Sequence, residues 1–240
     1  MTGILVVSDL HYKHGYHRNI YEGDALNWLL KILDAHKPTD LIIAGDSDDG
    51  WSLEDWSNLT DKVHVSAIAG NHENLPLLQS AKNHDDDSRV WCKDGEARDI
   101  QGLKFGFINY IMALNEKRIK EGVPRKTPEA FWRHANELKG VQVLVTHESP
   151  WDESYGTRIH RAAGCDTVRA ILEANQYPIA LSGHLSGPFT VTRIGKTISI
   201  RVDSSPHEKV YAILQKESNV VSVQIYHDLE PVEAFAVPLP

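Results

Sequence analysis

Runs of consecutive apolar residues alternate with helix-like segments along the first two thirds of the chain. Such a run, without polar residues at every second position, is typical of a strand that is buried on both faces. Between the first two runs, leucines recur at helical spacing over residues 24–36, and Pro38 ends that helix. The predicted strands cover residues 3–8, 40–44, 63–69, 103–109, 141–146 and 179–182.

Two helices are marked by residues that can satisfy the free backbone N–H groups of a first turn. Ser52 is followed three positions later by Asp55, an acidic variant of the capping box, and opens a helix through Leu59. Thr127 precedes a proline at the first helical position and opens a helix that ends at Leu138. Further helices are expected at residues 75–82 and 166–175.

The last third of the chain predicts strands alone, joined by short turns. The pair Gly195-Lys196 suits a two-residue hairpin turn between two strand-like runs. The segment 93–95 (KDG) predicts an earlier hairpin, and an alternating strand begins at Asn219. After Asp228 we expect an extended tail, because prolines recur there.

This order of elements predicts the fold class. Strands that alternate with helices pair in parallel, whereas strands joined by hairpins pair antiparallel. We therefore expect an α/β fold in which two mixed sheets pack face to face with helices outside, a four-layer α/β/β/α sandwich. No linker or repeat interrupts the chain, so residues 1–240 form a single domain, with a core over about residues 3–215 and a C-terminal strand and tail over 219–240.

Composition narrows the class of protein. The chain is 41% hydrophobic and 24% charged, which excludes disorder, and no apolar run is long enough to span a membrane. Two cysteines and the absence of a signal-peptide pattern predict a cytoplasmic protein without a disulfide framework. The net charge of −8 disfavours nucleic acid as a partner and leaves a homo-oligomer open.

The residues that carry chemistry follow the predicted strands. Five strands each end in a carboxylate, amide or imidazole, and in α/β sheets ligands bind at that edge. Oxygen donors mixed with imidazoles, without thiolates, favour Mn²⁺, Fe or Zn²⁺, and two ions that share one aspartate suit displacement at phosphorus. The five blocks are DLH from residue 9, GDSDD from 45, GNHE from 70, THE from 146 and GHLSG from 183.

In order and spacing, these blocks resemble the signature motifs of the calcineurin-like metallophosphoesterases, in particular the small prokaryotic phosphodiesterases. The resemblance covers residues 4 to about 215. It implies a phosphoester hydrolase with two divalent ions, Mn²⁺ first and Fe, Zn or Ni as alternatives. The implied ligands are Asp9 and His11 at the first ion, Asp46 as the bridge, and Asn71, His147 and His184 at the second.

The resemblance also implies how the reaction proceeds. A hydroxide that bridges the ions attacks phosphorus in line with the leaving oxygen, and His72 protonates that oxygen as general acid. Asp49 matches the carboxylate that orients this histidine in some members, and Asp48 is the competing candidate. We expect a phosphodiesterase; a phosphomonoesterase, a nuclease of the same superfamily and a non-catalytic interaction module are the alternatives.

One block departs from the family pattern. In the family, the last motif has a second histidine that binds the first metal. In this chain, Ser186 stands at that position. A neutral hydroxyl is a poor ligand for a transition metal, so we expect a weaker first site. His160 is a candidate for the missing ligand.

The loop after His147 adds candidate substrate contacts. Arg158 and Arg161 can hold phosphate oxygens, and aromatic residues beside them can stack on a leaving group. A solvated loop without such a role is the alternative. Lys13, His14 and His17, which follow the first block, leave the same two interpretations open.

Overall fold

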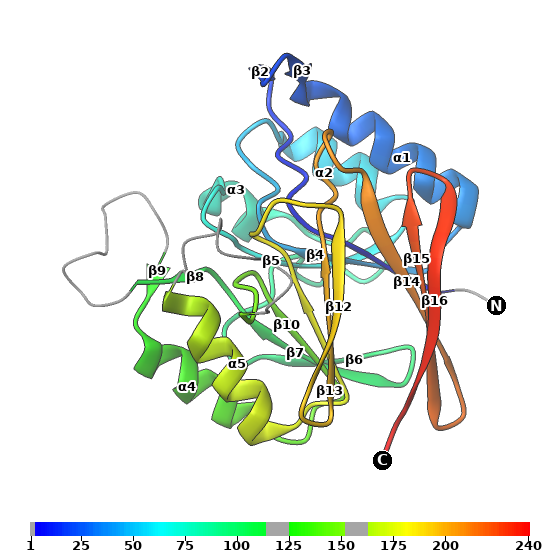
Figure 1. Cartoon of the computed structure of the whole chain (residues 1–240). Coiled ribbons are helices and arrows are strands. Elements are labelled where there is room, and N and C mark those ends of the chain that lie inside the picture. The colour runs from blue at the N-terminus through cyan, green and yellow to red at the C-terminus, as the bar shows by residue number, and fades with distance from the viewer. Residues whose placement is uncertain (1–2, 114–124, 152–162) are drawn as a thin grey trace.

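The computed structural model describes residues 3–113, 125–151 and 163–240. Two six-stranded sheets form its centre, and both mix parallel with antiparallel pairs (Figure 1). The first sheet has the order β16-β15-β14-β1-β4-β5 and the second β12-β13-β11-β10-β7-β6. The first sheet consists of β1 (Ile4–Val7), β4 (Asp40–Ala44), β5 (His64–Ile68), β14 (Val210–Glu217), β15 (Val220–His227) and β16 (Glu230–Pro238). The second consists of β6 (Ala97–Ile100), β7 (Leu103–Ile108), β10 (Val143–Thr146), β11 (Ile179–Ser182), β12 (Phe189–Ile194) and β13 (Thr197–Val202).

Helices cover the outer faces of both sheets, which confirms the expected layers. α1 and α2 lie beside the first sheet, and α4 and α5 beside the second (Figure 1). Short elements complete the fold. The helices are η1 (Glu22–Asp24), α1 (Ala25–His36), α2 (Leu53–Thr60), α3 (Leu75–Ser80), α4 (Pro128–Glu137) and α5 (Ala163–Asn175). The short strands are β2 (Tyr16–His17), β3 (Ile20–Tyr21), β8 (Ile111–Met112) and β9 (Arg125–Lys126). No helix in the described ranges has both the length and the apolar character needed to cross a bilayer.

Burial on both faces explains the continuous apolar runs. In β1, Ile4 and Val6 belong to the core between the sheets, and Leu5 and Val7 belong to the core under the helices. Successive side chains of a strand point to opposite faces, so a strand with two dry faces needs an apolar residue at every position. The strands that carry the functional residues are therefore held by packing from both sides.

The expected helix starts are present. The hydroxyl of Ser52 accepts a hydrogen bond from the backbone N–H of Asp55, whose carboxylate accepts one in return. The hydroxyl of Thr127 accepts from the backbone N–H of Ala130. Both caps satisfy donors that have no partner within the helix.

One of the two expected hairpin turns differs from the structure, whereas the turn at Gly195-Lys196 is present between β12 and β13. The segment 93–95 does not join two hairpin strands; β6 and β7 are joined at Gln101 and Gly102, which both have positive φ. The carboxylate of Asp94 instead accepts hydrogen bonds from Asn109 and Lys126, so this turn is held by tertiary contacts. Sequence analysis also missed the small hairpin formed by β2 and β3.

The tail after Asp228 is extended as expected, and it forms a paired strand. β16 pairs antiparallel with β15 from Val220–Pro238 to His227–Glu230, with a register shift at Ile225. Pro231 and Pro238 lie in this strand. Proline has no backbone N–H to donate, and it is tolerated here because β16 is the edge strand of its sheet and has a neighbouring strand on one side only.

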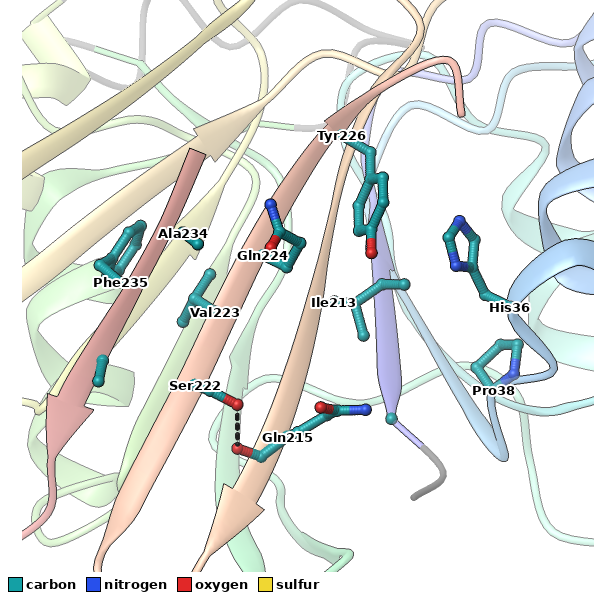
Figure 2. Close-up of a pocket in the computed structure, with 12 residues that line it drawn as sticks. His36, Pro38, Ile213, Gln215, Ser222, Val223, Gln224, Tyr226, Ala234 and Phe235 are labelled. Carbon is teal, nitrogen blue, oxygen red and sulfur yellow. Dashed lines mark hydrogen bonds between the residues drawn. The ribbon is translucent and has the colours of Figure 1, made fainter. Parts of the chain in front are cut away.

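One groove lies away from the strand ends that carry chemistry. This groove of about 520 Å³ runs between the end of α1 and the outer face of β14, β15 and β16. Figure 2 shows Tyr226 and Ile213 facing His36 and Pro38 across it. Gly3, at the amino end of β1, lines this groove, whereas Asp9 follows the carboxyl end of the same strand.

Candidate metal centre

Loops from both sheets are joined by backbone hydrogen bonds at the carboxyl ends of their strands. The N–H of Asp9 donates to the carbonyl of Gly45 at 2.9 Å, and that of His11 donates to the carbonyl of Asp46 at 3.0 Å. In the second sheet, the N–H of Gly183 donates to the carbonyl of His147 at 3.2 Å. Between the sheets, the N–H of Tyr110, after β7, donates to the carbonyl of Ala69, after β5, at 2.6 Å. The loops therefore form one connected unit rather than independent segments.

This unit brings the predicted ligands into two groups that share one residue. Asp9, His11 and Asp46 form the first group, and Asp46, His147 and His184 form the second. Within each group, one donor atom from every residue lies within 4.8 Å of the others. The shared residue is Asp46, the one for which a bridging position was predicted.

Asp46 is a buried carboxylate surrounded by donors. Its Oδ1 accepts the backbone N–H of His72 at 2.8 Å, and its Oδ2 lies 3.2 Å from Nε2 of His147. Burial opposes ionisation, but the charge of His147, together with the backbone N–H of His72, outweighs it and lowers the pKa of Asp46. The group is therefore ionised and offers negative charge to a cation.

Two of the predicted ligands each have a buried polar atom without a hydrogen-bond partner. Nδ1 of His147 lies 2.8 Å from the carbonyl oxygen of Ala44, which can only accept, so Nδ1 carries the hydrogen. Nε2 of the same ring is buried without a hydrogen bond, and so is Oδ1 of Asn71. Buried polar atoms without partners are costly. A metal ion that accepts both lone pairs would remove that cost.

His11 is oriented in the same manner by a carboxylate. Its Nδ1 lies 3.2 Å from Oδ2 of Asp48, and its Nε2 lies 3.9 Å from oxygens of both Asp9 and Asp46. A partner at one ring nitrogen fixes the tautomer and leaves the other nitrogen as a ligand. Asp48 is therefore the positioning residue for His11. Asp48 is the second aspartate of the GDSDD block, and from the sequence it was considered only as a partner of His72.

The ligands stand on strained backbone. Asp9, His11, Asp46 and His184 have φ of 57°, 47°, 53° and 67°, and Asp48 has 76°. Side chains other than glycine rarely adopt this left-handed region, and such residues persist only where the surrounding structure determines them. The cross-loop hydrogen bonds supply that constraint here.

Close approach of the loops requires glycine beside Asp46. A Cβ atom on Gly70 would lie 2.1 Å from Oδ1 of Asp46 and 2.7 Å from Nε2 of His147. One on Gly45, whose φ is +97°, would lie 2.5 Å from Nδ1 of His147. The glycines that precede the second and third blocks therefore leave the space that the ligands occupy.

Glu73 is a further residue that sequence analysis did not assign. Its Oε1 accepts the backbone N–H of Ser47 at 3.0 Å, and its Oε2 accepts the hydroxyl of Ser47 at 2.6 Å. It thus ties the loop after β5 to the loop after β4. Burial, with the nearby charge of Asp46, raises the pKa of Glu73 to about 7.

The predicted catalytic pair is not in contact. His72 is exposed and lines a pocket of about 240 Å³ together with Asp9, His11 and His184. Its ring meets that of His11 edge-on at 5.6 Å. Asp49 is exposed, and no hydrogen bond or ion pair between described residues joins it to His72. The role of Asp49 therefore stays a prediction.

Ser186 lines the same pocket and adds no strong ligand. Arg201 donates to the carbonyl of Gly187, whose N–H donates to Asp203, so this loop is held from β13 and the residue that follows it. In the described part of the chain, no fourth carboxylate, imidazole or thiolate joins the group of Asp9, His11 and Asp46 at the same distance. Of the remaining candidates, Arg158, His160 and Arg161 lie outside the described residues.

Two carboxylate–imidazole groups with a shared aspartate, at the joined strand ends of a four-layer sandwich, define a metallohydrolase centre. The family model for calcineurin-like phosphoesterases matches residues 2–188. The chain therefore belongs to this family, as its motifs predicted, and is a metal-dependent phosphoric ester hydrolase.

A solved structure shows the same fold at low sequence identity. TT1561 of Thermus thermophilus is 10% identical, with a TM-score of 0.66, over 95% of this chain and 99% of that chain. Two more distant similarities are to Vps29 of Chaetomium thermophilum and to YfcE, a phosphoesterase from E. coli. Vps29 is 11% identical, with a TM-score of 0.48, over 100% of each chain. YfcE is 13% identical, with a TM-score of 0.46, over 98% of this chain and 100% of that chain. No curated protein matches the sequence.

The contact between Asp48 and His11 generates a prediction about metal affinity. Asp48→Ala should weaken Mn²⁺ binding at the first group by roughly 10–100-fold, because His11 loses the partner that fixes its ring. Asp48→Asn, which keeps an acceptor oxygen, should lose less. Calorimetric titration of metal-free protein measures both. The exposed Glu54→Ala is the charge-matched control, and equal affinities in Asp48→Ala and this control would contradict the positioning role.

Proposed function

We propose that this chain is a phosphodiesterase that uses two divalent metal ions. The observation that carries the proposal is that the two ligand groups share Asp46. Asp9 and His11 would hold the first ion, and Asn71, His147 and His184 the second. The donors are oxygens and imidazoles without thiolates, which favours Mn²⁺, with Fe, Zn or Ni as alternatives.

The metal ions would lower the pKa of a water molecule and neutralise charge that develops on the phosphoryl oxygens. The protein supplies position and a proton. Asp46 and the oriented rings of His11 and His147 hold fixed places because their backbones are constrained. His72 stands at the rim of the pocket, where its ring can reach a leaving oxygen and donate a proton to it.

The pocket has room for a substituent on the attacked phosphate. Besides residues of the ligand groups, it is lined by Lys13, His17 and Arg18. We place a diester ahead of a monoester because the motifs resemble those of the small prokaryotic phosphodiesterases.

Hydrolysis of matched nitrophenyl esters tests the proposed function. The Mn²⁺-loaded protein should cleave bis-p-nitrophenyl phosphate with a higher kcat/KM than p-nitrophenyl phosphate. Protein stripped with EDTA and assayed in metal-free buffer should cleave neither ester. Full turnover by the stripped protein would refute the metal requirement, and faster cleavage of the monoester would refute the diester preference.

His72→Ala should lower kcat about 10²-fold or more on esters with poor leaving groups, which need the proton most. The loss should be small for p-nitrophenolate, which leaves without protonation. Metal content, measured by elemental analysis, should stay at the wild-type value because the side chain of His72 is outside both ligand groups. Loss of metal in this variant would make His72 a ligand and not an acid.

Ser186→His should strengthen the first ion site, because an imidazole replaces a hydroxyl at the pocket wall. In the wild type, activity should keep rising with added Mn²⁺ after the tighter site is full. The variant should reach half-maximal rate at a lower concentration. Calorimetry on metal-free protein counts the sites independently of turnover. Two equally tight sites in the wild type would show that another residue already supplies the missing ligand.

A further inference from the structure

One wall of the catalytic pocket carries an arginine that the ligand groups do not use. Arg18 lines the pocket of about 240 Å³ that also contains Asp9, His11 and His184. Its side chain is exposed and makes no hydrogen bond or ion pair with any described residue. An arginine fork without a partner, facing a phosphoester site, is the arrangement that recognises phosphate oxygens in pairs.

The backbone presents this arginine on a tight turn. β2 and β3 pair through Tyr16–Tyr21 and His17–Ile20, which leaves Arg18 and Asn19 as the two turn residues. Their φ values are 46° and 68°, as in a two-residue turn with both central residues left-handed. Glycine and asparagine usually fill such turns, so an arginine at the first position stands on strained backbone. The turn fixes the direction in which the side chain of Arg18 leaves the backbone, at a position that lines the pocket.

The opposite wall holds the hairpin in place. The ring of His17 meets the ring of His207 at 5.4 Å and 88°, so the hairpin contacts the loop that follows β13. Nε2 of His207 is buried without a hydrogen bond. This contact places a polar ring of the pocket lining beside the hairpin that carries Arg18.

The other charges on the pocket leave Arg18 as its free cation among the described residues. Nζ of Lys13 lies 3.0 Å from Glu22 and 3.8 Å from Asp48, so its charge is already compensated. Asp203 accepts backbone N–H groups of Gly187 and Ser205. Glu208 also lines the pocket and forms no ion pair with a described residue, so its charge would oppose a bound anion.

We propose that Arg18 binds a second phosphate group of the substrate, at a subsite beyond the phosphorus that is attacked. This inference rests on the proposed function, because it takes the ligand groups as the place where the first phosphate binds. It narrows the substrate class to phosphodiesters that carry another phosphate. Arg18 is then a specificity residue and has no part in the chemical step.

Binding of two nucleotides that differ by one phosphate tests the subsite. Calorimetry on Mn²⁺-loaded protein compares thymidine 3′,5′-bisphosphate with thymidine 5′-monophosphate, and phosphate release is followed in parallel to exclude turnover. The wild type should bind the bisphosphate about tenfold more tightly, the size expected of one charge-assisted contact. Arg18→Ala should lose this preference, and Arg18→Lys should keep part of it.

The Arg18 variants share the backbone strain of the wild type, because Ala and Lys carry the same Cβ as arginine at this left-handed position.

Two further variants, at other positions, test the role of charge. Glu208→Gln should increase the preference because it removes the opposing charge. Arg193→Ala, an exposed arginine outside the pocket, should leave the preference unchanged. Equal affinity of the wild type for the two nucleotides, or an undiminished preference in Arg18→Ala, would overturn the subsite.

Failure of the subsite and failure of the proposed function give different results. If the wild type prefers the bisphosphate through Arg18 but does not cleave bis-p-nitrophenyl phosphate, the subsite stands and the phosphodiesterase proposal fails. If it cleaves that diester, which has no second phosphate, and shows no preference, the phosphodiesterase proposal stands and the subsite fails.

Discussion

The arrangement of the centre depends on how the ionised carboxylate of Asp46 is compensated, because Asp46 is only 2% exposed. A charge in such a place needs compensation, because desolvation of a carboxylate costs several kcal/mol. In the protein without metal, the compensation comes from a ring of the second sheet, His147, and from a backbone N–H of the first sheet, at His72. The two sheets are therefore held together at the carboxyl ends of their strands by the attraction between Asp46 and His147, as well as by the apolar core between them. A cation would enter an environment that is already arranged for positive charge.

Rigid strands fix the positions from which the ligand loops begin. The strands that precede the ligands are buried on both faces, so each begins its loop from a fixed point and direction. The loops are short, cross-linked by backbone hydrogen bonds and held in left-handed conformations that a free loop would leave. Strain is thus stored next to the ligands and balanced by packing in the strands behind them. This division explains why the side chains can be preorganised although the pocket itself is open to solvent.

Much of this could be predicted from the sequence, because the signals were local. Continuous apolar runs identified the strands, caps identified the helices, and the blocks at strand ends placed the ligands. The rest depended on tertiary contacts. The carboxylate beside His11 belongs to Asp48 and not to the adjacent Asp49. The direction of the backbone decides between the two, and the sequence does not reveal it. The hairpin turn falls at Gln101 and not at Gly95, because a tertiary hydrogen-bond network holds the earlier turn. The proline-containing end of the chain forms a strand because β15 offers it an open edge.

The pairing of β1 has a consequence for how the chain acquires its fold during synthesis. Its partner on one side, β4, follows soon after, but its partner on the other side is β14, with Ile4 opposite Leu214. During synthesis, β1 therefore has one open edge until β14 has been made. Contacts between such distant residues slow folding and leave an apolar edge available to other chains. A deletion that removed β14 would therefore leave β1 with one unpaired edge, although the two strands lie about as far apart in the sequence as any neighbouring pair in the sheet.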